Sequence, residues 1–143
     1  MKRRVMIIGG GASGMTAAIA AAREGADAVI LEHTKRPGKK ILSTGNGKCN
    51  LTNLDMRKEA FRGENPGFAW KVVGEVPVKE TLFFFEDLGL VLTDRNGYVY
   101  PATGQASSVL DALRFELERL NIPVLCAHVG EVHALAEGAR GDD

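Results

Sequence analysis

The chain has 143 residues, of which 45% are hydrophobic and 25% charged, so it has the size of one domain and an ordinary globular composition. Lys and Arg balance Asp and Glu at a formal net charge of zero, which argues against a broad basic surface for nucleic acid or for an acidic membrane. No apolar run approaches the roughly 20 residues that a membrane-spanning helix needs. We therefore expect neither nucleic-acid nor membrane partners, while the composition leaves the oligomeric state open.

The two cysteines, Cys49 and Cys126, lack the spacing of a metal-binding or redox motif. We expect two free thiols, no bound metal and a cytoplasmic location, because reducing compartments keep such thiols unpaired.

The first predicted elements form a strand–turn–helix–strand unit between residues 4 and 32. The short apolar run 5–8 predicts a buried parallel strand. Residues 13–24, mostly alanine, predict a helix that Gly25 ends, and residues 28–31 predict a second strand that leads into Glu32.

A glycine turn joins the first strand to the helix. Gly9, Gly11 and Gly14 have the G-x-G-x-x-G spacing. The first glycine would allow a tight bend, the second a close approach of the backbone to a pyrophosphate, and the third a close packing of helix on strand. The free N–H groups at the start of the helix would face the phosphates, so the unit predicts dinucleotide binding.

Glu32 adds chemistry to this unit. Its carboxylate can accept hydrogen bonds from the hydroxyls of an adenosine ribose and would repel a 2′-phosphate, which favours FAD or NAD over NADP. The alternative is an α/β domain that only needs a tight turn, and it leaves Glu32 without a function.

Residues 33–53 are rich in glycine, lysine and asparagine and lack periodicity, so we predict a long loop that contacts the cofactor. Lys39 and Lys40 follow Glu32 closely enough to reach a nucleotide at the turn. Lys35 and Arg36 are interpreted as solvated charges.

Residues 54–104 predict an excursion of helices and a hairpin. Helices are expected over 68–73 and 78–88, and in the second the side chains that should share a buried face are Leu82, Phe83, Phe85 and Leu88. Core packing is therefore preferred over an aromatic cofactor site for Phe83, Phe84 and Phe85. Strands over 90–93 and 98–100 would be joined through Asn96-Gly97.

Residues 105–120 predict an amphipathic helix, followed by strands over 123–126 and 129–136. A strand after this helix would extend the parallel sheet. His128 and His133 lack acidic or metal-ligand partners at useful spacing and are interpreted as structural or exposed. Residues 1–136 are thus assigned to one domain, and residues 137–143 to a polar tail.

Two segments resemble one protein family. The chain is similar to the BaiN/YhiN-like flavoproteins in Gly-Gly-Gly-Ala-Ser-Gly-Met and in the more specific run Gly-Lys-Lys-Ile-Leu-Ser-Thr-Gly-Asn-Gly-Lys-Cys-Asn-Leu-Thr-Asn. These proteins are also described as NAD(P)/FAD-dependent oxidoreductases or aminoacetone-oxidase-family FAD-binding enzymes. The resemblance extends from Arg4 to about Leu135 and implies a Rossmann-like α/β FAD-binding domain with a parallel sheet. It also implies hydride transfer to a small-molecule substrate, with NAD(P)H as the electron donor.

The resemblance further implies which residues bind FAD, and it assigns no catalytic acid or base. The pyrophosphate would contact Gly9, Gly11, Ala12, Ser13 and Gly14. The ribose would contact Glu32, and the adenine ring would contact the backbone around Val129. The flavin side would be lined by Lys40, Ile41, Ser43, Gly45, Asn46, Gly47, Lys48, Cys49 and Asn50.

Family members continue into a substrate domain and a C-terminal segment that closes over the flavin, and this chain is expected to lack both. We therefore predict an incomplete FAD-binding fold whose isolated chain binds FAD weakly and turns over little. Two alternatives stay open: a fragment of an NAD-binding Rossmann dehydrogenase, and a non-catalytic dinucleotide-binding module.

Overall fold

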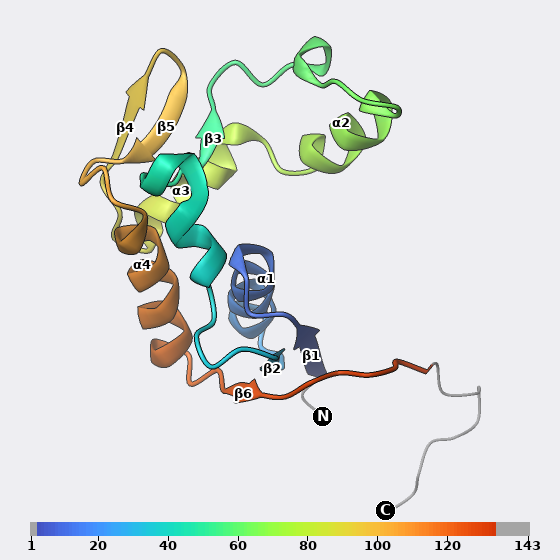
Figure 1. Ribbon diagram of the computed structural model, residues 1–143. Helices are drawn as coiled ribbons and strands as arrows, with labels where there is room; N and C mark the ends of the chain where they lie inside the picture. The colour runs from blue at the N-terminus through green and yellow to red at the C-terminus, as the bar shows by residue number, and fades with distance from the viewer. Residues whose placement is uncertain (1–2, 134–143) are drawn as a thin grey trace, which may run out of the picture.

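The computed structural model describes residues 3–133, and its first unit is a parallel sheet of three strands. The strands are β1 (Arg4–Ile8), β2 (Asp27–Glu32) and β6 (Val124–Cys126), in the order β1-β2-β6 (Figure 1). The helix α1 (Ala12–Arg23) connects β1 to β2. The predicted strand–turn–helix–strand unit is confirmed, as is the extension of the sheet, since β6 pairs in parallel with β2.

The core lies between this sheet and two helices on one of its faces. Helix α4 (Ala106–Arg119) packs beside α1, and Figure 1 shows both helices on the same side of the strands. Met15, Ile19, Ile30 and Leu113 are 0% exposed between them. Each such buried side chain contributes about 1.5–3 kcal/mol relative to exposure, so this layer holds the fold together.

A second, antiparallel sheet is formed by the chain between β2 and β6 and lies apart from the first sheet in space (Figure 1). Its strands are β3 (Thr52–Asn53), β5 (Tyr98–Pro101) and β4 (Leu92–Arg95), in that order. The predicted hairpin is confirmed: Asn96 and Gly97 both have left-handed φ angles, 53° and 86°, as a two-residue turn requires.

The excursion contains a short 3-10 turn, η2 (Lys58–Ala60), and the helices α2 (Pro66–Gly74) and α3 (Val78–Asp87). Helix α2 begins where Asn65 accepts a hydrogen bond from the N–H of Phe68 at 3.0 Å, with Pro66 in the first helical position. Both helices agree with the prediction.

The predicted buried face of α3 is wrong for one residue. Phe83 is 68% exposed, whereas Phe84, Phe85 and Leu88 are half-buried against the core. Successive helical residues turn by about 100°, so a face that holds residues 84, 85 and 88 directs residue 83 toward solvent.

Residues 33–53 are not one irregular loop, contrary to the prediction. They contain η1 (Lys39–Gly47), a 3-10 segment kinked where Thr44 is extended and Gly45 and Asn46 are left-handed, and the strand β3. Ile41 anchors η1 because its side chain is 4% exposed against the core beside α4. A single buried apolar residue leaves no periodicity in the sequence, which is why the turn was not predicted.

The predicted strand over 129–136 is not present over 129–133, and residues 134–136 and the predicted tail 137–143 lie outside the described residues. The strand β2 ends at Glu32, which pairs with Cys126. The pairing of β6 with β2 ends where the Ala127 N–H donates to the Glu32 carbonyl at 2.9 Å. Beyond that point no neighbouring strand is available within residues 3–133. Over the same range, no helix is long and apolar enough to cross a membrane.

Candidate functional site

The glycine turn after β1 has the geometry that its spacing predicts. Gly9 has φ +100°, a left-handed value that favours glycine, and its N–H donates to the Leu31 carbonyl at 2.7 Å. A Cβ on Gly14 would lie 1.8 Å from the carbonyl oxygen of Gly9, so only glycine lets α1 pack this closely on the turn. A Cβ on Gly11 would meet nothing within 4 Å, so this position opens toward free space.

The start of α1 is available to an anion. Gly11 is the N-cap residue and offers no side-chain hydrogen bond, and the first turn of the helix contains no acidic residue. The first N–H groups of a helix lack intrahelical partners and carry a partial positive charge. A phosphate group is the ligand that such an end of a helix favours.

Glu32 is buried beside this turn, with 7% of its surface exposed. One carboxylate oxygen accepts the N–H of Gly10 at 2.6 Å, and the other accepts the N–H of Thr34 at 2.8 Å. The ring nitrogen Nδ1 of His33 lies 3.1 Å from that second oxygen. The main-chain hydrogen bonds from Gly10 and Thr34 lower the pKa of Glu32 to about 2, so the side chain is an anion at neutral pH.

The carboxylate of Glu32 still has capacity for a ligand. An ionised carboxylate offers about four lone-pair positions, and the main chain occupies two of them. A ribose hydroxyl could therefore donate to Glu32 without breaking its contacts to Gly10 and Thr34.

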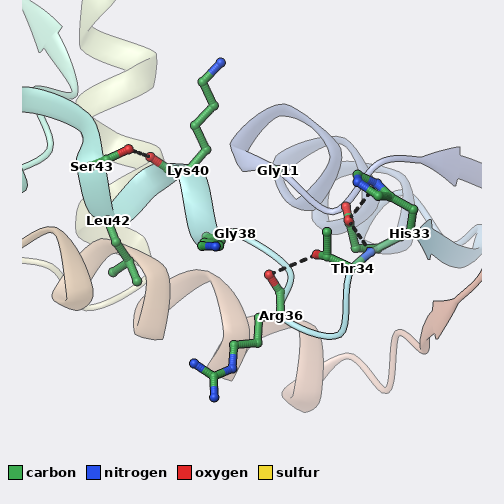
Figure 2. Close-up of a pocket in the computed structure, with 10 residues that line it drawn as sticks. Gly11, His33, Thr34, Arg36, Gly38, Lys40, Leu42 and Ser43 are labelled. Atoms are coloured by element: carbon green, nitrogen blue, oxygen red, sulfur yellow. Dashed lines mark hydrogen bonds and ion pairs between the residues drawn. The ribbon is translucent and has the colours of Figure 1, made fainter.

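A pocket of about 580 Å³ lies between the glycine turn and η1 (Figure 2). It brings together four of the residues that sequence analysis assigned to the cofactor, namely Gly11, Glu32, Lys40 and Ser43. The other lining residues were not among the predicted cofactor residues, although Lys39 was expected to lie within reach of a nucleotide. They are His33, Thr34, Arg36, Gly38, Lys39 and Leu42.

The sequence feature that could have identified these additional lining residues is their position directly after Glu32. The chain leaves β2, passes Thr34 and Arg36, and turns at Gly38 into η1, so several residues of this connection border one pocket (Figure 2). Arg36 was interpreted as solvated, and although its side chain is exposed it also lines the pocket.

A second pocket, of about 230 Å³, lies at the carboxyl ends of the parallel strands. It is lined by Ile8, Gly9, Leu31, His33, Ala127, His128 and Val129. Val129 thus lies near the glycine turn, where the family resemblance expects the adenine ring. His33 is the lining residue that the two pockets share.

The remaining predicted cofactor residues line neither pocket, and their assignment stays a prediction. Ile41 and Cys49 are buried in the core. The side-chain amide of Asn50 donates to the carbonyls of Thr52 and Val99, both at 3.1 Å, which ties the segment to the antiparallel sheet. The others are Ala12, Ser13, Gly14, Gly45, Asn46, Gly47 and Lys48.

Neither cysteine forms a disulfide; Cys49 is buried and Cys126 exposed. Over residues 3–133, no group of three or more His, Cys, Asp or Glu side chains could hold a metal ion.

Comparison with known proteins adds a family and several relatives. Residues 3–139 match the family model described as the HI0933-like protein Rossmann domain. The 3-dehydro-bile acid delta(4,6)-reductase of Clostridium scindens is 49% identical over 140 residues, covering 96% of this chain and 34% of that protein. The ribosomal RNA dihydrouridine synthase of Escherichia coli is 28% identical over 117 residues, covering 82% and 29%. The chain therefore spans about a third of the length of these relatives.

A solved structure shares the fold. The crystal structure of Thermovibrio ammonificans THI4 superposes with a TM-score of 0.56 over 87% of this chain and 38% of that one, at 16% sequence identity. This likeness supports the Rossmann-like arrangement of the strands and helices and carries no information on activity.

Proposed function

The chain belongs to the HI0933-like Rossmann-domain family, and from this premise we propose that it is the FAD-binding portion of a flavin-dependent oxidoreductase. The reaction that we propose is NAD(P)H-linked reduction of an unsaturated or carbonyl small molecule. When bound, FAD would supply hydride transfer, and the residues of this chain would bind and orient it.

One observation carries the proposal. Gly11, Glu32 and Lys40 come from three different elements and border the same pocket of about 580 Å³. The helix end at Gly11 suits a pyrophosphate, the Glu32 carboxylate suits the ribose hydroxyls, and the Lys40 ammonium suits a phosphate oxygen. This set of donors and acceptors fits the adenosine diphosphate half of a dinucleotide.

The charge of Glu32 supports FAD over an NADP cofactor at this position. The carboxylate is ionised at neutral pH because its pKa is lowered to about 2. A 2′-phosphate on the adenosine ribose would then face a buried anion, and the two charges would repel.

The names of the relatives support the reaction class. The Clostridium scindens protein is a reductase of delta(4,6) double bonds in a 3-dehydro bile acid, and the Escherichia coli protein makes dihydrouridine in ribosomal RNA. Both names describe the addition of hydrogen to a carbon–carbon double bond. We carry the reaction class to this protein and leave the substrate open.

A visible absorbance spectrum tests the proposal. The purified chain is mixed with FAD, the excess is removed by gel filtration, and bound flavin is measured near its absorbance bands. We expect partial retention, below one flavin per chain because the isolated chain is predicted to bind FAD weakly, and we expect Gly11→Asp to abolish it because it places an anion at the phosphate site. Ala20→Asp is the matched control, since it adds the same charge at an exposed position of the same helix.

Two results would contradict the proposal. One is a chain that takes up no flavin yet binds NADH at micromolar concentration, which would favour the NAD-binding dehydrogenase. The other is flavin retention that Gly11→Asp and Ala20→Asp leave equally unchanged, which would place the flavin elsewhere.

A further inference from the structure

A third cavity, of about 120 Å³, is bordered by the end of η1, by both strands of the hairpin and by the turn after β5. It shares no lining residue with the pocket at the glycine turn or with the pocket beside Val129. A group bound there would therefore be separate from one bound at Gly11. The lining residues are Lys48, Thr93, Arg95, Tyr100, Pro101 and Gly104.

The strand register places the polar side chains of the hairpin on one face. Thr93 is paired with Tyr100, and Arg95 lies two positions further along β4. Because alternate residues of a strand point to the same side of a sheet, these three side chains share a face. Val99 points to the opposite side and is 3% exposed. The hairpin thus presents a guanidinium and two hydroxyl groups on the face opposite Val99.

The segment that carries Lys48 is fixed against this hairpin. Lys48 is the C-cap residue of η1, and Cys49, which follows it, is buried in the core. The side-chain amide of Asn50 and the N–H of Leu51 both donate to the Val99 carbonyl of β5, at 3.1 and 2.9 Å. These contacts hold the main chain next to Lys48 beside β5, so the ammonium group is brought to the cavity by a short, anchored tether.

The cavity carries positive charge without a compensating acid. Its lining contains Lys48 and Arg95 and no carboxylate, and neither cation forms an ion pair within residues 3–133. Asp94 lies on the other face of β4, and its carboxylate accepts the Gly97 N–H at 3.2 Å in the hairpin turn. Two like charges around one small cavity repel each other, and a bound anion offsets that repulsion.

An oxyanion fits this set of donors. A guanidinium presents parallel N–H groups that match two oxygens of a carboxylate or phosphate. The ammonium of Lys48 adds charge, and the hydroxyls of Thr93 and Tyr100 can each donate a further hydrogen bond. The volume of about 120 Å³ is well below the roughly 300–1,000 Å³ of a pocket for a whole ligand, so the cavity suits one charged group of a larger molecule.

The segment η1 connects this cavity to the nucleotide pocket. Lys40 and Ser43 line the pocket of about 580 Å³, and Lys48, at the end of the same segment, lines the cavity. We propose that the cavity binds a carboxylate or phosphate group of the substrate, so that the substrate of this oxidoreductase is an anion. The assignment of the bound anion as substrate rests on the proposed function, whereas the anion site itself does not.

Amide NMR spectra of the isotope-labelled chain test the proposal by titration. The probes are benzoate and phenyl phosphate, which carry the two candidate groups on the same ring, and benzamide is the neutral control at the same ionic strength. We expect at least one of the two anions to shift the amide signals of Thr93, Arg95 and Tyr100 saturably, and benzamide to leave them in place. The anion that binds more tightly identifies the group as carboxylate or phosphate.

Substitution of the guanidinium supplies the second part of the test. Arg95→Gln should weaken binding of the preferred anion at least ~10-fold, because hydrogen bonds between charged groups are lost. Arg57→Gln is the matched control, since it removes a guanidinium that is 65% exposed and lies outside the cavity. Lys48→Gln gives an independent measurement and should also weaken binding. The same spectra show whether each variant keeps the fold.

Three results would overturn the anion site. They are the absence of saturable shifts with both anions, equal shifts with benzamide, and equal anion affinity in Arg95→Gln and Arg57→Gln.

Failure of this proposal is distinguishable from failure of the proposed function, because anion binding and FAD binding have separate readouts. Gly11→Asp should lose FAD and still bind the anion, while Arg95→Gln should lose the anion and keep its FAD affinity. A loss of FAD affinity in Arg95→Gln would assign the cavity to the cofactor and overturn the substrate assignment.

Discussion

The carboxylate of Glu32 accepts a hydrogen bond from the main-chain N–H of Gly10 at 2.6 Å, so the acid at the end of β2 closes the turn that follows β1. The two residues are 22 positions apart in the sequence, yet they form one unit. The same side chain shapes the glycine turn and, under the proposed function, would also face the ribose of a bound dinucleotide.

Replacing this carboxylate tests both purposes. We predict that Glu32→Gln weakens FAD binding by about 10- to 100-fold, because the amide can accept only one of the two main-chain N–H groups through its oxygen and the charge is lost. The measurement is a fluorescence titration of FAD. Glu118→Gln, on the exposed side of α4, is the control and should bind like the unaltered protein. An unchanged affinity for Glu32→Gln would refute the ribose assignment.

Substitutions at two glycines of the turn should affect stability and FAD binding separately. Gly14→Ala places a methyl group 1.8 Å from the Gly9 carbonyl oxygen. Because the helix or the turn must then shift, we predict a loss of stability of about 1–3 kcal/mol. Gly11→Ala meets no atom within 4 Å, so its stability should be unchanged while its FAD affinity falls. Chemical unfolding and FAD titration of both variants decide the matter. Equal stability losses in the two variants would contradict the packing argument.

Three helices meet at Glu116 of α4. This side chain is 8% exposed and accepts hydrogen bonds from Arg23 of α1, at 2.7 Å, and from Arg119, at 2.6 Å. Arg23 also pairs with Asp87, the last residue of α3, at 2.8 Å. The hydrogen bond from Arg119 is the largest cause that lowers the pKa of Glu116, to about 2, with Arg23 adding to it.

We predict that Glu116→Gln destabilises the protein by about 1–3 kcal/mol, since hydrogen bonds to charged groups are lost at a buried position. Urea unfolding followed by circular dichroism gives the free energy of unfolding. Glu118→Gln, two residues away and exposed, is the matched control. A free energy within about 0.5 kcal/mol of the unaltered protein would mean that solvent replaces the network at no cost.

How well the sequence predicts an element depends on whether that element is determined by neighbouring residues or by contacts with residues far along the chain. The unit from β1 to Glu32 was predictable because each part, the apolar run, the glycine spacing and the alanine-rich helix, is encoded locally. The anchor of η1 was not, because Ile41 is buried by contacts with α4, far along the chain. The exposure of Phe83 and the burial of Glu116 were missed for the same reason: each is decided by which neighbouring helix packs against it.

The residues of the candidate site divide in the same way, into those predicted from local sequence and those placed by the path of the folded chain. The positions of Gly11 and Glu32, which both border the pocket, were predicted from spacing, whereas Thr34 and Arg36 border it because the chain between β2 and η1 runs along the pocket. The pairing that places Leu125 on the same face of the parallel sheet as Met6 and Ile8 likewise depends on β6, which pairs with β2 from the far end of the chain.

The two buried carboxylates should also make stability depend on pH. The pKa values of Glu32 and Glu116 are each lowered from 4.5 to about 2 in the folded protein, so both groups bind protons more weakly when folded than when unfolded. Their contribution to stability is therefore present above pH 4.5 and is lost as the pH falls from about 4.5 toward about 2. We predict that the free energy of unfolding decreases over this window, and that the decrease is smaller in Glu32→Gln, Glu116→Gln and the double variant. Urea unfolding at a series of pH values, with Glu118→Gln as the control, measures the slope. A double variant whose stability falls as steeply as that of the unaltered protein would show that other carboxylates carry the acid sensitivity.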